Sequence, residues 1–244
     1  MRSAECGVRE CSQAVRRNAH LSLVLIIPKS EIRIQMTLLA DTYLDRIDFL
    51  KYLPQTDCGE CGAISCQEFV NDLKQGSKRP EDCPDISEGL YYPFQVALDA
   101  DNLLPKFPCL TVPHPGPTGL VEINTPDDAS PILISGNNVH TQDVITSILG
   151  TTKSPFFLLF ADTRGDTIDM AVILESLTVE VISREVVESG ILQRTSHQDI
   201  VIPGLASSMH DELKESTGWK VTVGPICAAE LPLFFGERWL PPVT

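Results

Sequence analysis

Four cysteines within a span of 26 residues constrain this chain more than any other feature of its sequence. They are separated by two, four and sixteen residues, and a proline directly follows the last of them. Thiolates are soft anionic ligands that suit iron, and four of them complete the tetrahedral coordination of the irons in a cubane. The sequence therefore predicts a [4Fe-4S] cluster. Its predicted ligands are Cys58, Cys61, Cys66 and Cys83.

Two glycines inside the cysteine loop support the cluster. Gly59 and Gly62 permit positive φ, which lets backbone N–H groups turn toward the sulfides and adjust the reduction potential. Structural zinc also uses four cysteines, but its sites usually present two separated CxxC pairs. Three close cysteines and a distant fourth favour the cluster, and zinc stays the alternative. The five histidines form no HExxH motif or i,i+4 pair, and His140 alone lies near a predicted strand end.

Charge and hydropathy limit the partners and the compartment. A formal net charge of -14 argues against nucleic acid, because phosphate binding needs clustered Lys and Arg. The apolar run from Leu21 to Ile27 is too short to span a bilayer and lacks a small-residue cleavage site. We therefore expect a cytoplasmic protein without a membrane span, in which clustered cysteines bind metal rather than form disulfides. Residues 1–35 are expected to be a disordered extension or a start-site artefact, with Cys6 and Cys11 incidental.

Helical periodicity flanks the cysteine loop. Apolar positions recur at helical spacing over residues 37–53, and a short helix is expected over 67–75. Residues 84–104 are expected to be irregular to helical, and five prolines between positions 105 and 117 then predict a stiff linker. We place a [4Fe-4S] cluster domain at 36–90, a Pro-rich linker at 91–129 and an α/β domain at 130–244.

After the linker, apolar strands alternate four times with amphipathic helices. This pattern predicts a parallel sheet with helices on both faces, where ligands bind at the carboxyl ends of the strands. The turns after the strands are small or polar, as a ligand crevice requires, although Gly and Pro also occur in such turns for geometry alone. The expected strands are 131–135, 156–162, 199–203 and 219–224, and the expected helices are 141–149, 169–189, 206–216 and 228–234.

Other common chemistries lack support in the sequence. The strand-end turns carry neither GxGxxG nor GxxxxGK[ST], so the usual dinucleotide and P-loop signatures are missing. A nucleophile elbow or a catalytic triad pattern does not stand out, and no catalytic residue is predicted. Cys109 and Cys227 have no partner spacing and are expected to be small buried residues.

Two segments resemble the large (gamma) subunit of the corrinoid iron-sulfur protein of the acetyl-CoA synthase/CO dehydrogenase pathway. Residues 57–84, DCGECGAISCQEFVNDLKQGSKRPEDCP, resemble its [4Fe-4S] domain, and stretches at 130–138, 158–172 and 200–235 resemble its corrinoid-binding domain. The resemblance implies an α/β protein in which a small helical [4Fe-4S] domain precedes a parallel-sheet, Rossmann-like corrinoid-binding domain. The family's central TIM barrel is lacking, because only residues 85–130 join the two matches.

The same resemblance implies a cobalamin-type corrinoid, bound base-off and held by the strand-end loops. Residues 166–171 would face the cobalt, and Met170 aligns with a cobalt-liganding cysteine of the related mercury-methylating protein. The DxHxxG motif of histidine-on cobalamin proteins is absent, so neither thiolate nor histidine ligation is supported. The implied corrinoid contacts are Asn137, Asn138, Thr167, Met170, Gly204, Gly224 and Pro225.

Three functions stay open at this point. In the first, the cluster reduces cobalt to Co(I) and the corrinoid carries a methyl group between partner proteins, as a component of a methyltransferase system rather than a stand-alone enzyme. In the second, the chain is an electron-transfer or reductive-activation module for another protein's corrinoid, without cobalamin of its own. In the third, it is a structural interaction protein. The first requires residues 105–117 to act as a hinge that brings the cysteine loop near the cobalt.

Overall fold

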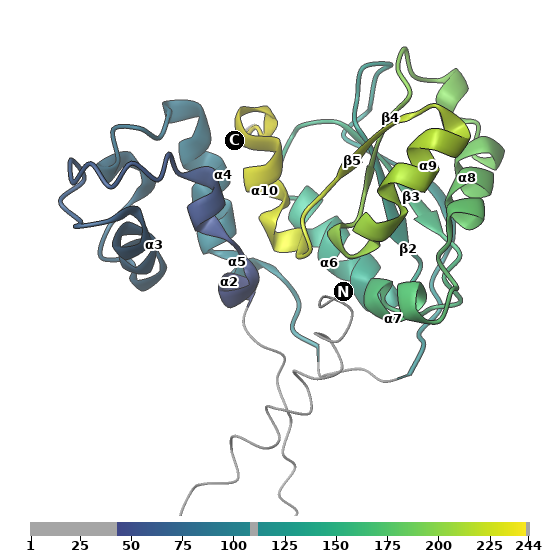
Figure 1. The fold of residues 1–244 in the computed structure, drawn as a ribbon, viewed down its shortest axis with the longest axis horizontal. Coiled ribbons are helices and arrows are strands. Elements are labelled where there is room, and N and C mark those ends of the chain that lie inside the picture. The colour runs from purple at the N-terminus through teal and green to yellow at the C-terminus, as the bar shows by residue number, and fades with distance from the viewer. Residues whose placement is uncertain (1–42, 108–111, 243–244) are drawn as a thin grey trace, which may run out of the picture.

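A computed structural model describes residues 43–107 and 112–242 of the chain (Figure 1). A small helical part that carries the cysteine loop lies beside a larger part built on a mostly parallel sheet (Figure 1). The predicted fold class is therefore confirmed. The expectations for residues 1–35 and for Cys109 fall outside the described residues. Among the helices that the structure describes, none is long and apolar enough to cross a membrane.

Short helices surround the cysteine loop. Where the periodicity predicts one helix over 37–53, the described residues form α2 (Tyr43–Arg46) and the 3-10 helix η1 (Phe49–Tyr52). The break occurs because Asp48 leaves the helical conformation and caps a new turn, accepting a hydrogen bond from the Lys51 N–H. Helix α3 (Cys66–Gln75) lies where a helix is predicted.

Ordered elements extend into the segment that we expect to be a linker. The 3-10 helix η2 (Pro80–Asp82) precedes α4 (Glu88–Leu98) and α5 (Ala100–Leu103), and strand β1 (Gly119–Ile123) follows the prolines. The sequence pattern does not predict β1, because the residues of this strand are half-buried to exposed and the segment before it is rich in proline. The domain boundaries themselves stay a prediction.

The sheet has five strands in the order β1-β3-β2-β4-β5. The four predicted strands are parallel to one another, whereas β1 joins the edge of β3 in the antiparallel direction. Strands β2 and β3 are buried throughout, as their continuous apolar runs indicate. The parallel strands are β2 (Ile132–Gly136), β3 (Phe156–Ala161), β4 (Asp199–Ile202) and β5 (Lys220–Val223).

The helices that follow the strands are more interrupted than the periodicity predicts. The single helix expected over 169–189 is two helices, α7 (Ile168–Ile173) and α8 (Val179–Glu188), because Glu175 adopts a φ of 55° between them. Thr178 then caps α8 by accepting a hydrogen bond from the Val181 N–H. The other elements are α6 (Val139–Leu149), η3 (Ile191–Gln193), η4 (Gly204–Met209), α9 (His210–Thr217), η5 (Ala228–Glu230), α10 (Leu231–Phe235) and η6 (Gly236–Arg238).

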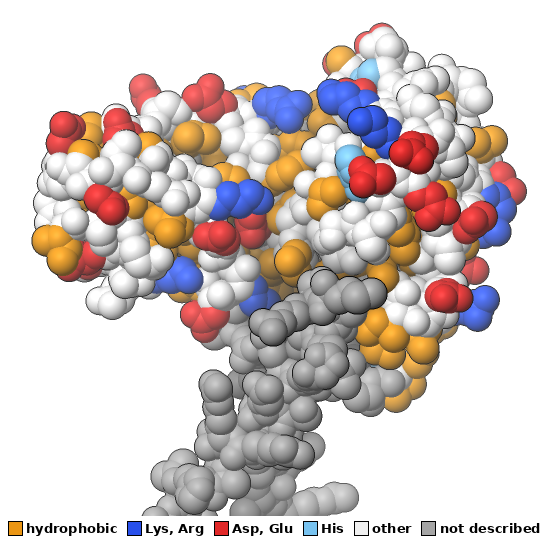
Figure 2. Space-filling model, viewed as in Figure 1, with side chains coloured by type: hydrophobic (Ala, Val, Ile, Leu, Met, Phe, Trp, Pro, Cys, Tyr) orange, Lys and Arg blue, Asp and Glu red, His pale blue; other side chains and the backbone are white. Residues whose placement is uncertain are grey.

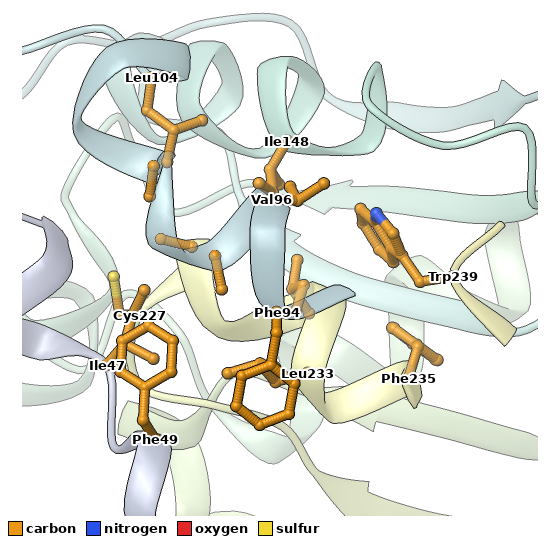
Figure 3. Close-up of a cluster of buried hydrophobic side chains, with 14 of the residues drawn as sticks. Ile47, Phe49, Phe94, Val96, Leu104, Ile148, Cys227, Leu233, Phe235 and Trp239 are labelled. Atoms are coloured by element: carbon orange, nitrogen blue, oxygen red, sulfur yellow. The ribbon is translucent and has the colours of Figure 1, made fainter. Parts of the chain in front are cut away.

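Each face of the sheet has its own hydrophobic core. One core packs the sheet against α7, α8 and α9. The other joins the opposite face of the sheet to α6, α10 and the whole helical part, so that Phe49, Phe94 and Leu233 belong to one cluster (Figure 3). A hinge motion at residues 105–117 would therefore separate two parts that share a core.

Candidate metal centre and strand-end site

The four predicted ligands line one cavity in the helical part. Cys83 is buried, Cys61 and Cys66 are half-buried, and Cys58 is exposed, and all four thiols are free. Leu53 and Phe69 form part of the same lining. Residues that are distant in the sequence thus place their sulfur atoms around one space that opens to solvent at Cys58.

Positive φ angles shape the loop around this cavity. Gly59 and Gly62 have φ values of 75° and 77°, and the Gly62 N–H donates to the Gly59 carbonyl at 2.9 Å. An L side chain rarely adopts this backbone conformation, which explains the glycine at each position. Gln55 and Asp57 are strained exceptions, with φ values of 56° and 50°. The loop can therefore turn tightly enough to present Cys58 and Cys61 to the same cavity.

Two carboxylates fix the second half of the loop. Asp57 Oδ1 accepts a hydrogen bond from the Cys66 N–H at 2.7 Å, and Glu68 Oε2 accepts one from the Ile64 N–H at 2.6 Å. Ser65 caps α3 by accepting from the Glu68 N–H at 3.1 Å. These bonds hold Cys66 at the first turn of a regular helix, where its direction is defined.

The fourth ligand comes from a separate turn. Arg79 N–H donates to Asp82 Oδ2 at 2.7 Å, and the Cys83 N–H donates to the Pro80 carbonyl at 3.2 Å, which closes η2 just before the cysteine. Burial is the main cause that raises the pKa of the Cys83 thiol. Bound iron would counter this rise in pKa, because a metal favours the thiolate form of the cysteine.

A cluster and a single ion require different arrangements of four thiols. One zinc ion would need four sulfur atoms at about 2.3 Å from a common point. In the described parts of the chain, no group of three or more His, Cys, Asp or Glu side chains is close enough to hold one metal ion. The four thiols that line this cavity suit a larger group such as a cubane, in which each thiolate would ligate one iron.

At the carboxyl ends of the strands, Asn137 ties two loops together. Its Oδ1 accepts hydrogen bonds from the backbone N–H groups of Thr163 and Gly165, each at 3.0 Å, and its Nδ2 donates to the Gly116 carbonyl at 3.1 Å. The side chain is buried. The polar atoms of Asn137, a predicted corrinoid contact, are therefore hydrogen-bonded within the protein. The side chain shapes the strand-end edge rather than projecting from it.

Asn138 has a similar structural role. Its Oδ1 caps α6 by accepting from the N–H groups of His140 and Thr141, and its Nδ2 donates to the Gly165 carbonyl at 2.8 Å. The His114 N–H donates to the same carbonyl at 2.8 Å. Gly165 is required here, because a Cβ would lie 2.3 Å from Pro115 N. The segment around His114 thus packs on the strand-end edge, a contact that the sequence does not indicate.

The predicted contacts after β4 and β5 lie against one another. The Gly204 N–H donates to the Pro225 carbonyl at 3.1 Å, and the Gly224 N–H donates to the Ile202 carbonyl at 2.9 Å. A Cβ on Gly204 would lie 2.7 Å from Ile226 N, so glycine permits the two loops to touch. The structure brings these three predicted residues together at one half of the edge.

The α7 end of the edge offers partly exposed and apolar groups. Thr167 directly precedes α7 and its hydroxyl donates to Asp169 at 2.5 Å, while Met170 is half-buried. Hydrophobic side chains gather on the surface over α7 (Figure 2), where Ile173 and Leu174 are 47% and 55% exposed. This surface differs from the mixed charged surface elsewhere in the view.

Two buried polar atoms near this edge have no hydrogen-bond partner among the described residues. They are Ser135 Oγ, near the end of β2, and His140 Nδ1, in the first turn of α6. The His140 ring lies 4.0 Å from the Phe107 ring and 5.1 Å from the His114 ring, centroid to centroid. Because buried polar atoms are normally paired, these atoms fit a site that receives a polar ligand.

Two family models match the chain. One, described as CO dehydrogenase/acetyl-CoA synthase delta subunit, matches residues 109–235, which is more than half of the chain. The chain belongs to this family. The other model, described as putative Fe-S cluster, matches residues 53–84, the stretch that contains the four cysteines.

Curated relatives of this CO dehydrogenase/acetyl-CoA synthase family member are named acetyl-CoA decarbonylase/synthase complex subunit gamma. The chain is 31% identical over 122 residues to the Methanopyrus kandleri protein and 29% identical over 121 residues to the Methanocaldococcus jannaschii protein. Each match covers 50% of this chain but only 26% and 25% of the relative. The matched region thus spans about a quarter of the length of these relatives.

These matches confirm the family that the cysteine motif and the strand-end segments predict. An iron-sulfur cluster and a corrinoid are the cofactors of that family. The residues assigned to each cofactor in this chain stay a prediction, and the structure refines their roles as described above.

The role of Asn137 in this family member leads to a stability prediction. Replacing Asn137 with alanine leaves the Thr163 and Gly165 N–H groups buried without their acceptor, and we expect the free energy of unfolding to fall by about 2 to 3 kcal/mol. Urea denaturation measures this. The control is Asn102→Ala, which removes an exposed amide bonded to Asp99 and should change stability by less than about 0.5 kcal/mol. Equal stability of the two variants would contradict the role of Asn137.

Proposed function

We propose that this chain is an iron-sulfur corrinoid protein whose [4Fe-4S] cluster keeps the cobalt reduced and whose corrinoid carries a methyl group between partner proteins. One observation carries the proposal: the same chain has a cavity lined by four thiols and a strand-end edge where two buried polar atoms lack a partner among the described residues. The partners would be a methyltransferase or a second corrinoid protein. The relatives are named as subunits of an acetyl-CoA decarbonylase/synthase complex, which supports a partnered role.

The chain's own residues would hold and orient the two groups. When bound, the cluster supplies single electrons and the corrinoid supplies a nucleophilic cobalt. The four cysteines would ligate the iron, and Asp57 and Glu68 would keep their loop closed. At the strand ends, Thr167 and Met170 are the candidates for direct contact, whereas the two asparagines would act by fixing the backbone of the loops.

A second candidate function is an electron-transfer module that serves a corrinoid on another protein. It is favoured by the arrangement of the two parts: the cysteine loop and α3 lie at one end of the molecule, away from α7 at the strand-end edge (Figure 1). The shared core holds the parts in this arrangement. An exposed Cys58 is consistent with electron exchange with another molecule.

Anaerobic purification of the full chain with metal analysis separates the two functions. We expect about four iron atoms per chain, and about one cobalt atom per chain after reconstitution with cobalamin. Iron without cobalt would reject the methyl carrier and leave the electron-transfer module. Zinc in place of iron would reject both functions.

A variant pair tests the placement of the corrinoid. Met170→Glu adds a charge at the start of α7 and should weaken cobalamin binding at least tenfold, whereas Val187→Glu, on the exposed surface of α8, should leave it unchanged. Cobalamin retention is measured by equilibrium dialysis and the absorption spectrum. Equal binding by both variants would remove Met170 from the site.

A further inference from the structure

A lysine contacts the cysteine loop from outside the motif. The Lys78 ammonium donates a hydrogen bond to the carbonyl oxygen of Cys61 at 2.7 Å. It also lies beside Gly62, where a Cβ would be 3.5 Å from Lys78 Nζ. The Lys78 ammonium therefore contacts the backbone of Cys61, a predicted iron ligand, and lies next to Gly62, which follows it.

The end of α3 is what brings Lys78 back to the loop. Gly76 stops the helix with a φ of 72°, and the N–H groups of Gly76 and Ser77 donate to the carbonyls of Leu73 and Asp72, each at 3.0 Å. This left-handed turn reverses the chain, because the residues that follow cannot continue the helix. Lys78 is half-buried as a result, and its contact links the turn after α3 to the loop before it.

The charges near the cavity give this ammonium an electrostatic role. Residues 52–73 contain no Lys or Arg, whereas Asp57 and Asp85 line the cavity, Glu60 lies in the loop and Glu68 lies in the first turn of α3. A cluster ligated by four thiolates is itself anionic, and reduction adds one more negative charge. Negative side chains therefore disfavour reduction, and a nearby cation favours it because it stabilises the more negative state.

We propose that Lys78 is a positioning residue that holds the backbone of the loop at Cys61 and raises the reduction potential of the [4Fe-4S] cluster. This inference rests on the proposed cluster and goes beyond it by naming the residue that sets its potential. Lys78 lies outside the four-cysteine pattern, so the motif alone does not identify it.

A redox titration of three variants of the full chain tests the proposal. Lys78→Met removes the charge, Lys78→Arg keeps it, and Lys74→Met is the matched control, because Lys74 lies on α3 with its ammonium 5.6 Å from the centre of the Phe49 ring. The midpoint potential is followed by electron paramagnetic resonance of the reduced cluster, with iron counted in every sample.

We expect Lys78→Met to lower the midpoint potential, with the equilibrium constant for reduction falling about tenfold, which corresponds to about 59 mV for a one-electron couple. Lys78→Arg should stay close to the parent protein, and Lys74→Met should shift far less than Lys78→Met. If Lys78→Met loses iron, Lys78→Gln, which keeps a donor but no charge, replaces it and should show the same fall.

Three results decide the matter. An unchanged midpoint in a fully loaded Lys78→Met or Lys78→Gln protein overturns the inference. An equal fall in Lys78→Arg overturns it too, because charge would not be the cause. Absence of a [4Fe-4S] signal from the parent chain would refute the proposed function instead, so the two failures are distinguishable.

Discussion

Replacing Cys66 with alanine is expected to abolish assembly of the [4Fe-4S] cluster. Cys66 begins α3, and its N–H donates a hydrogen bond to Asp57 Oδ1, which fixes the position of this cysteine beside the cavity. One iron would then lack its protein ligand. We expect the iron content after anaerobic reconstitution to fall from about four per chain to near zero. The electron paramagnetic resonance signal of the reduced cluster should disappear with it.

Cys227→Ala is the matched control for this loss. Cys227 is also a free and buried cysteine, but it lies in the core between the helical part and the sheet and does not line the cavity. Its burial was predicted from the sequence and is confirmed. We expect this variant to keep the iron content of the parent. Full iron in Cys66→Ala, or its loss in Cys227→Ala, would show that the ligands are assigned wrongly.

Phe94→Ala is expected to destabilise the whole molecule by about 3 to 5 kcal/mol. Phe94 is fully buried on α4, and its ring centre lies 6.1 Å from that of Phe49. Helix α4 packs on α10, which follows the last strand, so the ring lies in the core that joins the two parts (Figure 3). Removing it leaves a cavity that both parts line.

Denaturation with two probes measures this effect and tests the shared core. Circular dichroism reports on the whole chain and cluster absorbance reports on the helical part, and we expect both to change at one, lower denaturant concentration. The control is Val187→Ala on α8, where the parent side chain is 60% exposed and the cost should be below about 0.5 kcal/mol. Two separate transitions would mean that the parts fold independently, and would restore the hinge that we expect from the prolines.

Much of the fold follows from local patterns. The runs of apolar residues at β2 and β3 predict buried parallel strands, because a strand covered on both faces needs no polar positions. Strand β1 was missed because it pairs with β3 across more than thirty intervening residues and is only half-buried. The break after α7 was missed because periodicity does not reveal the positive φ of Glu175.

The two candidate sites differ in how far the sequence could define them. The four cysteine ligands can be predicted from the sequence, because both the preference of iron for thiolates and the spacing of the cysteines are visible in one short segment. The asparagines also stand out at a strand end, but their partners lie in other loops, and only the fold shows that Asn137 binds the backbone of Thr163 and Gly165. The cysteine motif does not indicate Lys78 for the same reason, because the contact of Lys78 with the Cys61 carbonyl depends on the chain reversal at Gly76.

The antiparallel direction of β1 has a consequence for how larger relatives could be built. Gly119 pairs opposite Phe160 near the carboxyl end of β3, so the chain enters the sheet at the strand-end edge. Phe107 and His114, which flank residues 108–113, both lie against His140 at that edge. A domain inserted between these two residues would therefore be connected at the carboxyl ends of the strands. The barrel that the resemblance implies between the two parts would thus lie next to the predicted corrinoid site without a long connecting segment. This chain keeps the insertion point at the strand-end edge but has no barrel between the two matched segments.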